Sequence, residues 1–65
     1  MKIRYFTDTD TLYIVFTTDP VAETRDIGAD AIADFGADGA VCAITVEHAS
    51  KRTGLPNISI EHVAN

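Results

Sequence analysis

The sequence predicts a mainly β (α+β) domain, an antiparallel meander of five or six short strands with one short helix near the C-terminus. Three observations predict it. Short runs of alternating or β-branched residues recur along the chain, turn-forming residues separate them at short intervals, and only one stretch favours a helix. A length of 65 residues allows one domain, which we place at residues 1–65.

The N-terminal part predicts two strands. Lys2–Phe6 alternates between polar and apolar residues, and residues 7–10 form a polar loop in which aspartates favour turns. Thr11–Thr17 is almost entirely β-branched or aromatic, which makes it the strongest strand prediction. Pro20 ends this strand because proline cannot donate to a β ladder and biases Asp19 toward an extended conformation.

The middle of the chain predicts an edge strand and a hairpin. Glu23–Ile27 is polar, as edge strands often are, and a turn follows at residues 28–30. Ala31–Phe35 and Ala40–Val46 flank a four-residue segment that contains Asp38-Gly39. Because an Asp-Gly pair between two apolar runs is a strong short-range hairpin signal, we expect these runs to pair.

A short helix is expected within Glu47–Thr53, where basic residues fall in the last turn and complement the helix dipole. Gly54 is placed to end it in the left-handed conformation, and Pro56 follows as a stop. Asn57–Val63 alternates again and predicts a last strand. An alternative is that this segment is helical or disordered.

The second predicted strand is apolar on both faces. Alternation places Leu12, Ile14 and Phe16 on one side and Tyr13 and Val15 on the other. A sheet with one wet face would alternate between apolar and polar residues, so this strand predicts cover on both sides. The helix and tail can cover one side, and a second copy of the chain is the natural cover for the other. The alternative is that Tyr13 and Val15 only form cross-strand pairs on a half-exposed face.

We therefore expect a non-enzymatic interaction module that forms a homodimer or higher homo-oligomer, with Tyr13, Val15 and Tyr5 at the interface. Such a module can also bind another protein through its edge strand. A chain this short buries little surface, and it carries a single cysteine, Cys42, and no paired zinc ligands. Neither a disulfide nor zinc is therefore expected to stabilise it. The lone thiol fits a cytoplasmic, reducing location best.

The charge balance argues against nucleic acid as a partner. The chain has 10 acidic and 5 basic residues, a net charge of −5, and its cations are scattered. Affinity for a polyanion depends largely on clustered Lys and Arg. The apolar runs are too short to span a membrane, so no membrane association is expected.

Few residues suggest chemistry. Asp8 and Asp10, with His48, are weak candidates for a metal site because two nearby loop carboxylates suit a hard cation. The pattern lacks the remaining oxygen ligands of a calcium loop, and turn formation is the favoured interpretation. No nucleophile, base and orienting group can be assembled, so we expect no enzyme activity and no cofactor.

Four segments resemble a family of short bacterial and archaeal proteins known as domain of unknown function 2283. Their order and spacing match across nearly the whole chain: Tyr5-Phe6-x-x-x-Asp10-x-Leu12-Tyr13-Ile14, Val21-Ala22-Glu23-Thr24, Asp34-x-x-x-Asp38-Gly39-x-Val41-x-x-Ile44 and Ala49-Ser50-Lys51-Arg52. The resemblance implies a compact sheet with a short helix and no assigned reaction.

Members of this family often resemble partners of small toxin-like proteins, so an antitoxin-like role is the alternative function. The acidity of the chain suits a basic partner of this kind. The sequence departs from the family pattern at two positions, where Phe6 and His48 replace aspartates. Any metal or catalytic role of those aspartates is weakened in this chain, although Asp10 remains.

Overall fold

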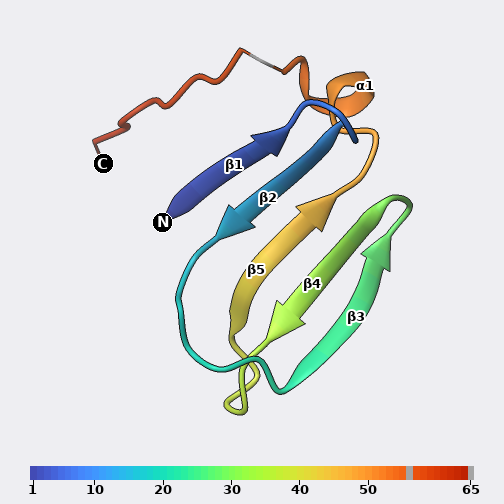
Figure 1. Ribbon diagram of the computed structural model, residues 1–65. Coiled ribbons are helices and arrows are strands. Elements are labelled where there is room, and N and C mark those ends of the chain that lie inside the picture. The colour runs from blue at the N-terminus through green and yellow to red at the C-terminus, as the bar shows by residue number, and fades with distance from the viewer. Residues whose placement is uncertain (56, 65) are drawn as a thin grey trace.

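The computed structural model describes residues 1–55 and 57–64. Five strands form one antiparallel sheet, and a single helical turn follows the last strand (Figure 1). The strands are β1 (Lys2–Phe6), β2 (Thr11–Val15), β3 (Glu23–Gly28), β4 (Ala31–Phe35) and β5 (Val41–Val46), and the helix is α1 (Ser50–Thr53). The predicted mainly β class with five antiparallel strands and one short helix near the C-terminus is confirmed.

The strand order differs from the simple meander that the sequence predicts. The sheet runs β1-β2-β5-β4-β3, so the chain leaves β2, passes across the end of the sheet and returns as the far edge strand β3 (Figure 1). The last strand, β5, then fills the gap between β2 and β4 and pairs antiparallel with both. The composition of the strands explains this order. The apolar strand β5 lies in the centre, whereas all six residues of the polar strand β3 are exposed at an edge.

Most predicted boundaries are close to those of the structure. The hairpin of β4 and β5 forms as expected, and Gly39 supplies the left-handed conformation that its turn requires, with φ 84°. The strand predicted over Thr11–Thr17 ends at Val15, although the amides of Phe16 and Thr17 still donate to the carbonyl of Cys42 at 2.8 and 3.2 Å.

The C-terminal predictions have different outcomes. Gly54 ends α1 in the left-handed conformation, as expected, with φ 71°. The strand expected over Asn57–Val63 is wrong, because residues 57–64 have no regular secondary structure and are exposed. Alternation is a local signal that does not specify a partner strand, and a strand forms only where its backbone makes ladder hydrogen bonds. β1 is an edge strand, but residues 57–64 form no ladder with it, and in Figure 1 this tail runs past β1 without joining the sheet. The predicted stop at Pro56 lies outside the described residues.

The buried core is small. Among the hydrophobic residues of the described part of the chain, the buried ones are Leu12, Ala33, Cys42, Ala43 and Ala49, and four of these five side chains are small. Large apolar side chains remain exposed on the strands, in the loops and along the tail, including Ile3, Phe6, Phe16, Val21, Ile27, Val41, Ile58, Ile60 and Val63. The chain by itself therefore forms a sheet with little packed interior.

Candidate functional site

The two faces of the sheet differ in what covers them. Residues that pair directly across strands share a face, so the register places Ile3 and Tyr5 on the same side as Leu12 and Ile14 of β2. We call this side the helix face. A pocket of about 260 Å³ on this face is lined by Ile3, Leu12 and Ile14 of the strands and by residues from α1 and the segment after it, namely Thr53, Leu55, Asn57, Ile58 and Ser59. The helix face therefore lies beneath α1 and the start of the tail.

A side-chain stack extends along the same face toward the far edge. The guanidinium of Arg25 on β3 lies 4.1 Å from the centre of the Phe35 ring, and its Nε is 3.0 Å from Glu23 Oε1. Register places all three side chains on the helix face, since Arg25 pairs with Ala33 and Glu23 pairs with Phe35. A cation over an aromatic ring shields part of that ring from water.

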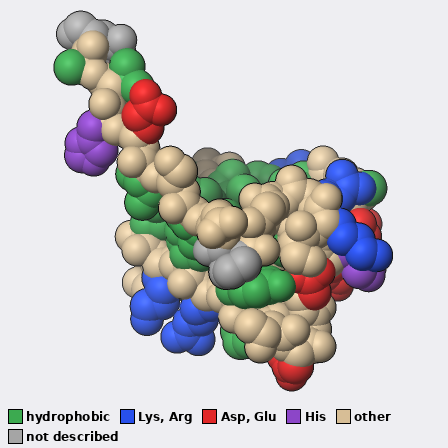
Figure 2. All heavy atoms as spheres, turned by 90° about the horizontal axis from the view of Figure 1, so that it is seen from above, with side chains coloured by type: hydrophobic (Ala, Val, Ile, Leu, Met, Phe, Trp, Pro, Cys, Tyr) green, Lys and Arg blue, Asp and Glu red, His purple; other side chains and the backbone are tan. Residues whose placement is uncertain are grey.

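The opposite side, which we call the open face, carries the other half of β2. Tyr13 and Val15 point to this side, and register adds Ala43 and Thr45 of β5 and Ile32 of β4. Tyr13, Val15 and Ile32 remain half-exposed, and the covering residues near α1 lie on the other face. Seen from above, cationic side chains project from two separate parts of the surface, at the lower left and the upper right, and the tail leaves at the upper left (Figure 2).

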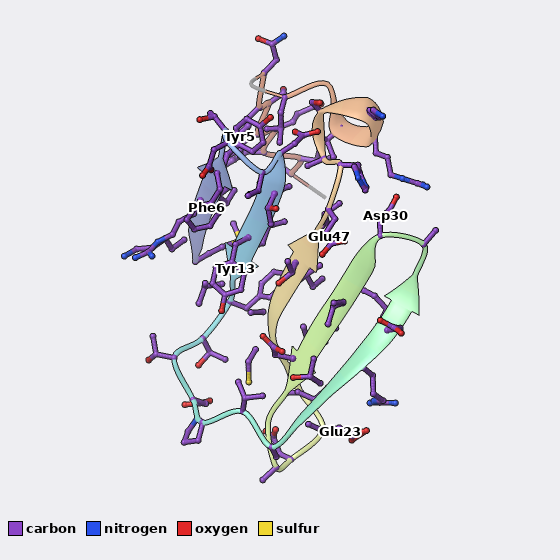
Figure 3. All side chains as sticks on the ribbon, turned by 45° about the vertical axis from the view of Figure 1, so that its right-hand side comes forward. Tyr5, Phe6, Tyr13, Glu23, Asp30 and Glu47 are labelled. Atoms are coloured by element: carbon purple, nitrogen blue, oxygen red, sulfur yellow. The ribbon has the colours of Figure 1, made fainter. Side chains whose placement is uncertain are left out.

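The sequence-predicted interface residues are thus divided between the two faces. Tyr13 and Val15 share the open face, as expected. Tyr5 does not join them, because it pairs with Leu12 and points to the helix face. Phe6 takes its place, since the alternation along β1 turns Phe6 toward the open face, where it is 45% exposed (Figure 3).

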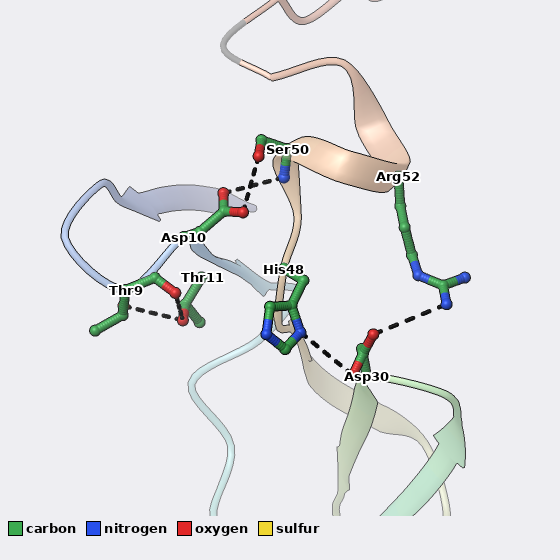
Figure 4. A network of polar contacts seen from close by, with 7 residues as sticks. All are labelled: Thr9, Asp10, Thr11, Asp30, His48, Ser50 and Arg52. Atoms are coloured by element: carbon green, nitrogen blue, oxygen red, sulfur yellow. Dashed lines mark hydrogen bonds and ion pairs between the residues drawn. The ribbon is translucent and has the colours of Figure 1, made fainter.

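A second group of polar residues gathers where α1 meets the sheet, and Asp10 is at its centre. The hydroxyl of Tyr5 donates to Asp10 Oδ1 at 2.5 Å, and the backbone amide of Ser50 donates to the same oxygen at 3.0 Å. The hydroxyl of Ser50 donates to Oδ2 at 2.8 Å (Figure 4). The carbonyl of Asp10 accepts from the amide of Ala49 at 2.9 Å. Asp10 thereby caps the first turn of α1 from a loop 40 positions away in sequence.

These contacts determine the protonation states of Asp10 and Tyr5. The hydrogen bond from Tyr5, and then those from Ser50, hold the pKa of the Asp10 carboxyl below its usual value. The same hydrogen bond to Asp10 raises the pKa of the Tyr5 phenol, and partial burial raises it further. The ionised carboxylate with a protonated phenol is therefore the stable form over a wide pH range.

Asp30 lies near Asp10 and contacts two side chains, those of His48 and Arg52. His48 Nδ1 lies 3.4 Å from Asp30 Oδ1, and the Arg52 guanidinium lies 3.8 Å from Oδ2 (Figure 4). Asp10, Asp30 and His48 all adopt positive φ, at 54°, 61° and 54°, which Asp and His tolerate better than most residues. The pairs are more than one third exposed and contribute little stability on their own.

The predicted metal candidates are not brought together. Asp8 is exposed in the β1–β2 loop, both oxygens of Asp10 accept hydrogen bonds, and His48 faces Asp30. Over residues 1–55 and 57–64, no three His, Cys, Asp or Glu side chains gather in a metal-binding arrangement. The arrangement around Asp10 instead joins the β1–β2 loop to α1. Sequence reasoning missed the role of Ser50, because nothing local links it to Asp10.

The comparisons with known proteins identify the class but not an activity. Residues 2–50 match the family described as protein of unknown function (DUF2283), and the chain belongs to that family. The match includes all five strands and stops at the first residue of α1. No curated protein and no solved structure matches the chain. Within the described residues, no helix is long and apolar enough to cross a membrane.

Proposed function

We propose that this protein is a homo-oligomeric interaction module in which the open face binds a second copy of the chain. The observation that carries the proposal is the contrast within β2. Leu12 is 7% exposed beneath α1, whereas Tyr13 and Val15 on the open face are half-exposed, as Ile14 is on the helix face. Full burial of an exposed Val, Leu, Ile, Phe or Met side chain stabilises a protein by about 1.5–3 kcal/mol. Within residues 1–55 and 57–64, the covering elements lie on the helix face and leave Tyr13 and Val15 without comparable cover.

The exposed area supports this proposal. The chain exposes 4932 Å², whereas the scaling for compact monomers gives about 4,000 Å² at 7.0 kDa. The excess of roughly 900 Å² is close to the ~800 Å² that each partner buries in a standard interface. The extended tail contributes much of this excess, since Ile58, Ile60 and Val63 are 57%, 75% and 71% exposed, and on the open face Phe6 is 45% exposed.

The polar groups favour a structural role over catalysis. The carboxylate of Asp10 is occupied by donors from Tyr5 and Ser50, and its contacts hold α1 against the sheet. This anchoring supports the proposal directly. It commits α1 to the helix face, so α1 cannot cover Tyr13 and Val15 on the other side.

Size-exclusion chromatography with light scattering at micromolar concentrations tests the proposal. The wild-type protein should have at least twice the mass of one chain, and Tyr13→Lys should reduce this mass toward that of one chain. Val21→Lys is a matched control, because Val21 is 52% exposed but lies in the loop before β3, outside the sheet. A wild-type protein that is monomeric and stably folded would contradict the proposal.

A further inference from the structure

The open face carries an ordered row of side chains that crosses all five strands. Register aligns Arg4 of β1 with Tyr13, Tyr13 with Thr45 of β5, Thr45 with Ile32 of β4, and Ile32 with Asp26 of β3. The row therefore begins with a cation at one edge of the sheet and ends with a carboxylate at the other. Arg4 and Asp26 are both exposed.

A second row of side chains, parallel to the first, also begins with a cation at β1 and has a carboxylate toward the opposite edge. Lys2 pairs with Val15, Val15 with Ala43, and Ala43 with Asp34, which in turn pairs with Thr24. The hydroxyl of Thr24 donates to Asp34 Oδ1 at 2.7 Å, which fixes this carboxylate on the open face. The face thus has a basic edge at β1, an apolar centre and an acidic edge at β3 and β4.

This polarity distinguishes two ways of stacking identical sheets face to face. A two-fold axis across the strands places β1 over β1 of the partner, so that cations face cations and carboxylates face carboxylates. A two-fold axis parallel to the strands places β1 over β3 of the partner and β5 over itself. Only the second arrangement sets opposite charges against each other at both edges, and like charges that face each other oppose association.

We propose that the second copy docks on the open face about a two-fold axis parallel to the strands, with Arg4 of each chain opposite Asp26 of the other. This inference rests on the proposed function and specifies its geometry. The aligned strands match the common packing of two β-sheets, which lie about 10 Å apart with strands within about 30°. Tyr13 of each copy then packs toward Ile32 of the other, and Lys2 faces the pair formed by Thr24 and Asp34.

Charge reversal with mixing tests this geometry. Arg4→Asp alone and Asp26→Arg alone each place two like-charged pairs in a symmetric dimer, so each should raise the dimer dissociation constant by at least about tenfold. An equimolar mixture of the two variants restores opposite charges at both positions. It should form a heterodimer with nearly wild-type affinity, which native mass spectrometry distinguishes from either homodimer.

Glu23→Arg provides the matched control. Glu23 lies on the same edge strand as Asp26, but it pairs with Phe35 and points to the helix face. Because Glu23→Arg keeps Arg4 and Asp26, it should form its own homodimer, and it should not draw Arg4→Asp into a heterodimer of nearly wild-type affinity. A wild-type dimer with no preferred pairing between Arg4→Asp and Asp26→Arg would overturn the geometry and leave the proposed function intact. A monomeric wild-type protein would overturn both.

Discussion

The helix face and the open face of β2 differ although they belong to the same five residues. Leu12 and Ile14 lie beneath α1 and the start of the tail, whereas Tyr13 and Val15 have no comparable cover from the described part of the chain. Within residues 1–55 and 57–64, α1 and the start of the tail cover one side of a strand that is apolar on both sides. A small domain that lacks core volume commonly gains it from a partner.

One carboxylate maintains this difference. Asp10 fixes the N-terminal end of α1 to the loop between β1 and β2, and therefore determines which face α1 covers. Without that anchor, the helical turn is too short to hold its position by its own hydrogen bonds. The difference between the two faces is therefore tested best by substitutions on the covered helix face and by substitution of Asp10, which anchors α1 to that face.

The largest effect is expected from truncating the covered side of β2. Leu12→Ala should reduce the free energy of unfolding by about 2–4 kcal/mol, because Leu12 is a large side chain that is 7% exposed, whereas the other buried core residues of the described chain are small. Urea denaturation measures this loss. Ile60→Ala in the tail is the control, since Ile60 is 75% exposed, and it should change the free energy by less than about 0.5 kcal/mol. Equal losses at the two positions would contradict the covered helix face.

The next largest effect is expected at the anchor. Asp10→Asn should lower the Tm, because the amide cannot accept all three hydrogen bonds that the carboxylate accepts from Tyr5 and Ser50. The decrease should be smaller than that of Leu12→Ala. Asp8→Asn changes the same kind of side chain at an exposed loop position and should leave the Tm unchanged. If both variants melt alike, the anchoring role is wrong.

The hydrogen-bonded pair of Tyr5 and Asp10 predicts how the stability of the protein depends on pH. The pKa of Asp10 is lowered in the folded protein, so its contribution is present above the unfolded pKa near 4 and is lost as pH falls through the lower folded value. The pKa of Tyr5 is raised, so its contribution is complete below about pH 10 and is lost as pH rises through the higher folded value. Thermal melts across pH should show both losses in the wild type. In Asp10→Asn, the part of each loss that arises from this pair should be absent.

A smaller effect is expected where α1 ends. Gly54→Ala should cost about 1 kcal/mol, because Gly54 has a φ of 71°, which an alanine adopts with strain. Gly28→Ala is the control, since a side chain there meets no atom within 4 Å and its φ requires no glycine. Comparing the two denaturation midpoints measures the difference. A similar cost at both positions would argue against the left-handed end of α1.

The smallest effect concerns the buried thiol. Burial raises the pKa of Cys42, and the negative charges of Asp19, Asp38 and Asp34 raise it further. The thiolate is the reactive form, so alkylation of the native protein should be at least about tenfold slower than that of the urea-unfolded chain. A kinetic assay with a chromogenic disulfide measures both rates. Rapid reaction of the native protein would indicate that the centre of the sheet opens readily.

Local patterns predict the strands well and their arrangement less well. The Asp38-Gly39 turn, the edge character of β3 and the end of α1 at Gly54 were all accessible from sequence, because each depends on neighbouring residues. The insertion of β5 between β2 and β4 was not, because it depends on pairing between distant segments. Alternation also predicted a strand over 57–63, where the tail passes the edge strand β1 without pairing with it.

The predictions for the candidate site show the same difference between local patterns and long-range pairing. The two-sided character of β2 follows from alternation alone, so Tyr13 and Val15 were correctly placed together. The placement of Tyr5 required the register of the first hairpin, which puts it opposite Leu12. The alignment of Arg4 with Asp26 required the order of all five strands, since three strands separate them.

Side-chain NMR of the wild-type protein tests the two-face account most directly. A soluble paramagnetic relaxation agent should broaden the Val15 and Ile32 methyl signals in dilute samples and spare them at concentrations where translational diffusion reports a dimer. The methyls of Ile60 should broaden at every concentration. If Val15 and Ile32 stay accessible to the agent while the folded protein diffuses as a single chain throughout, the open face is not an interface and the account is wrong.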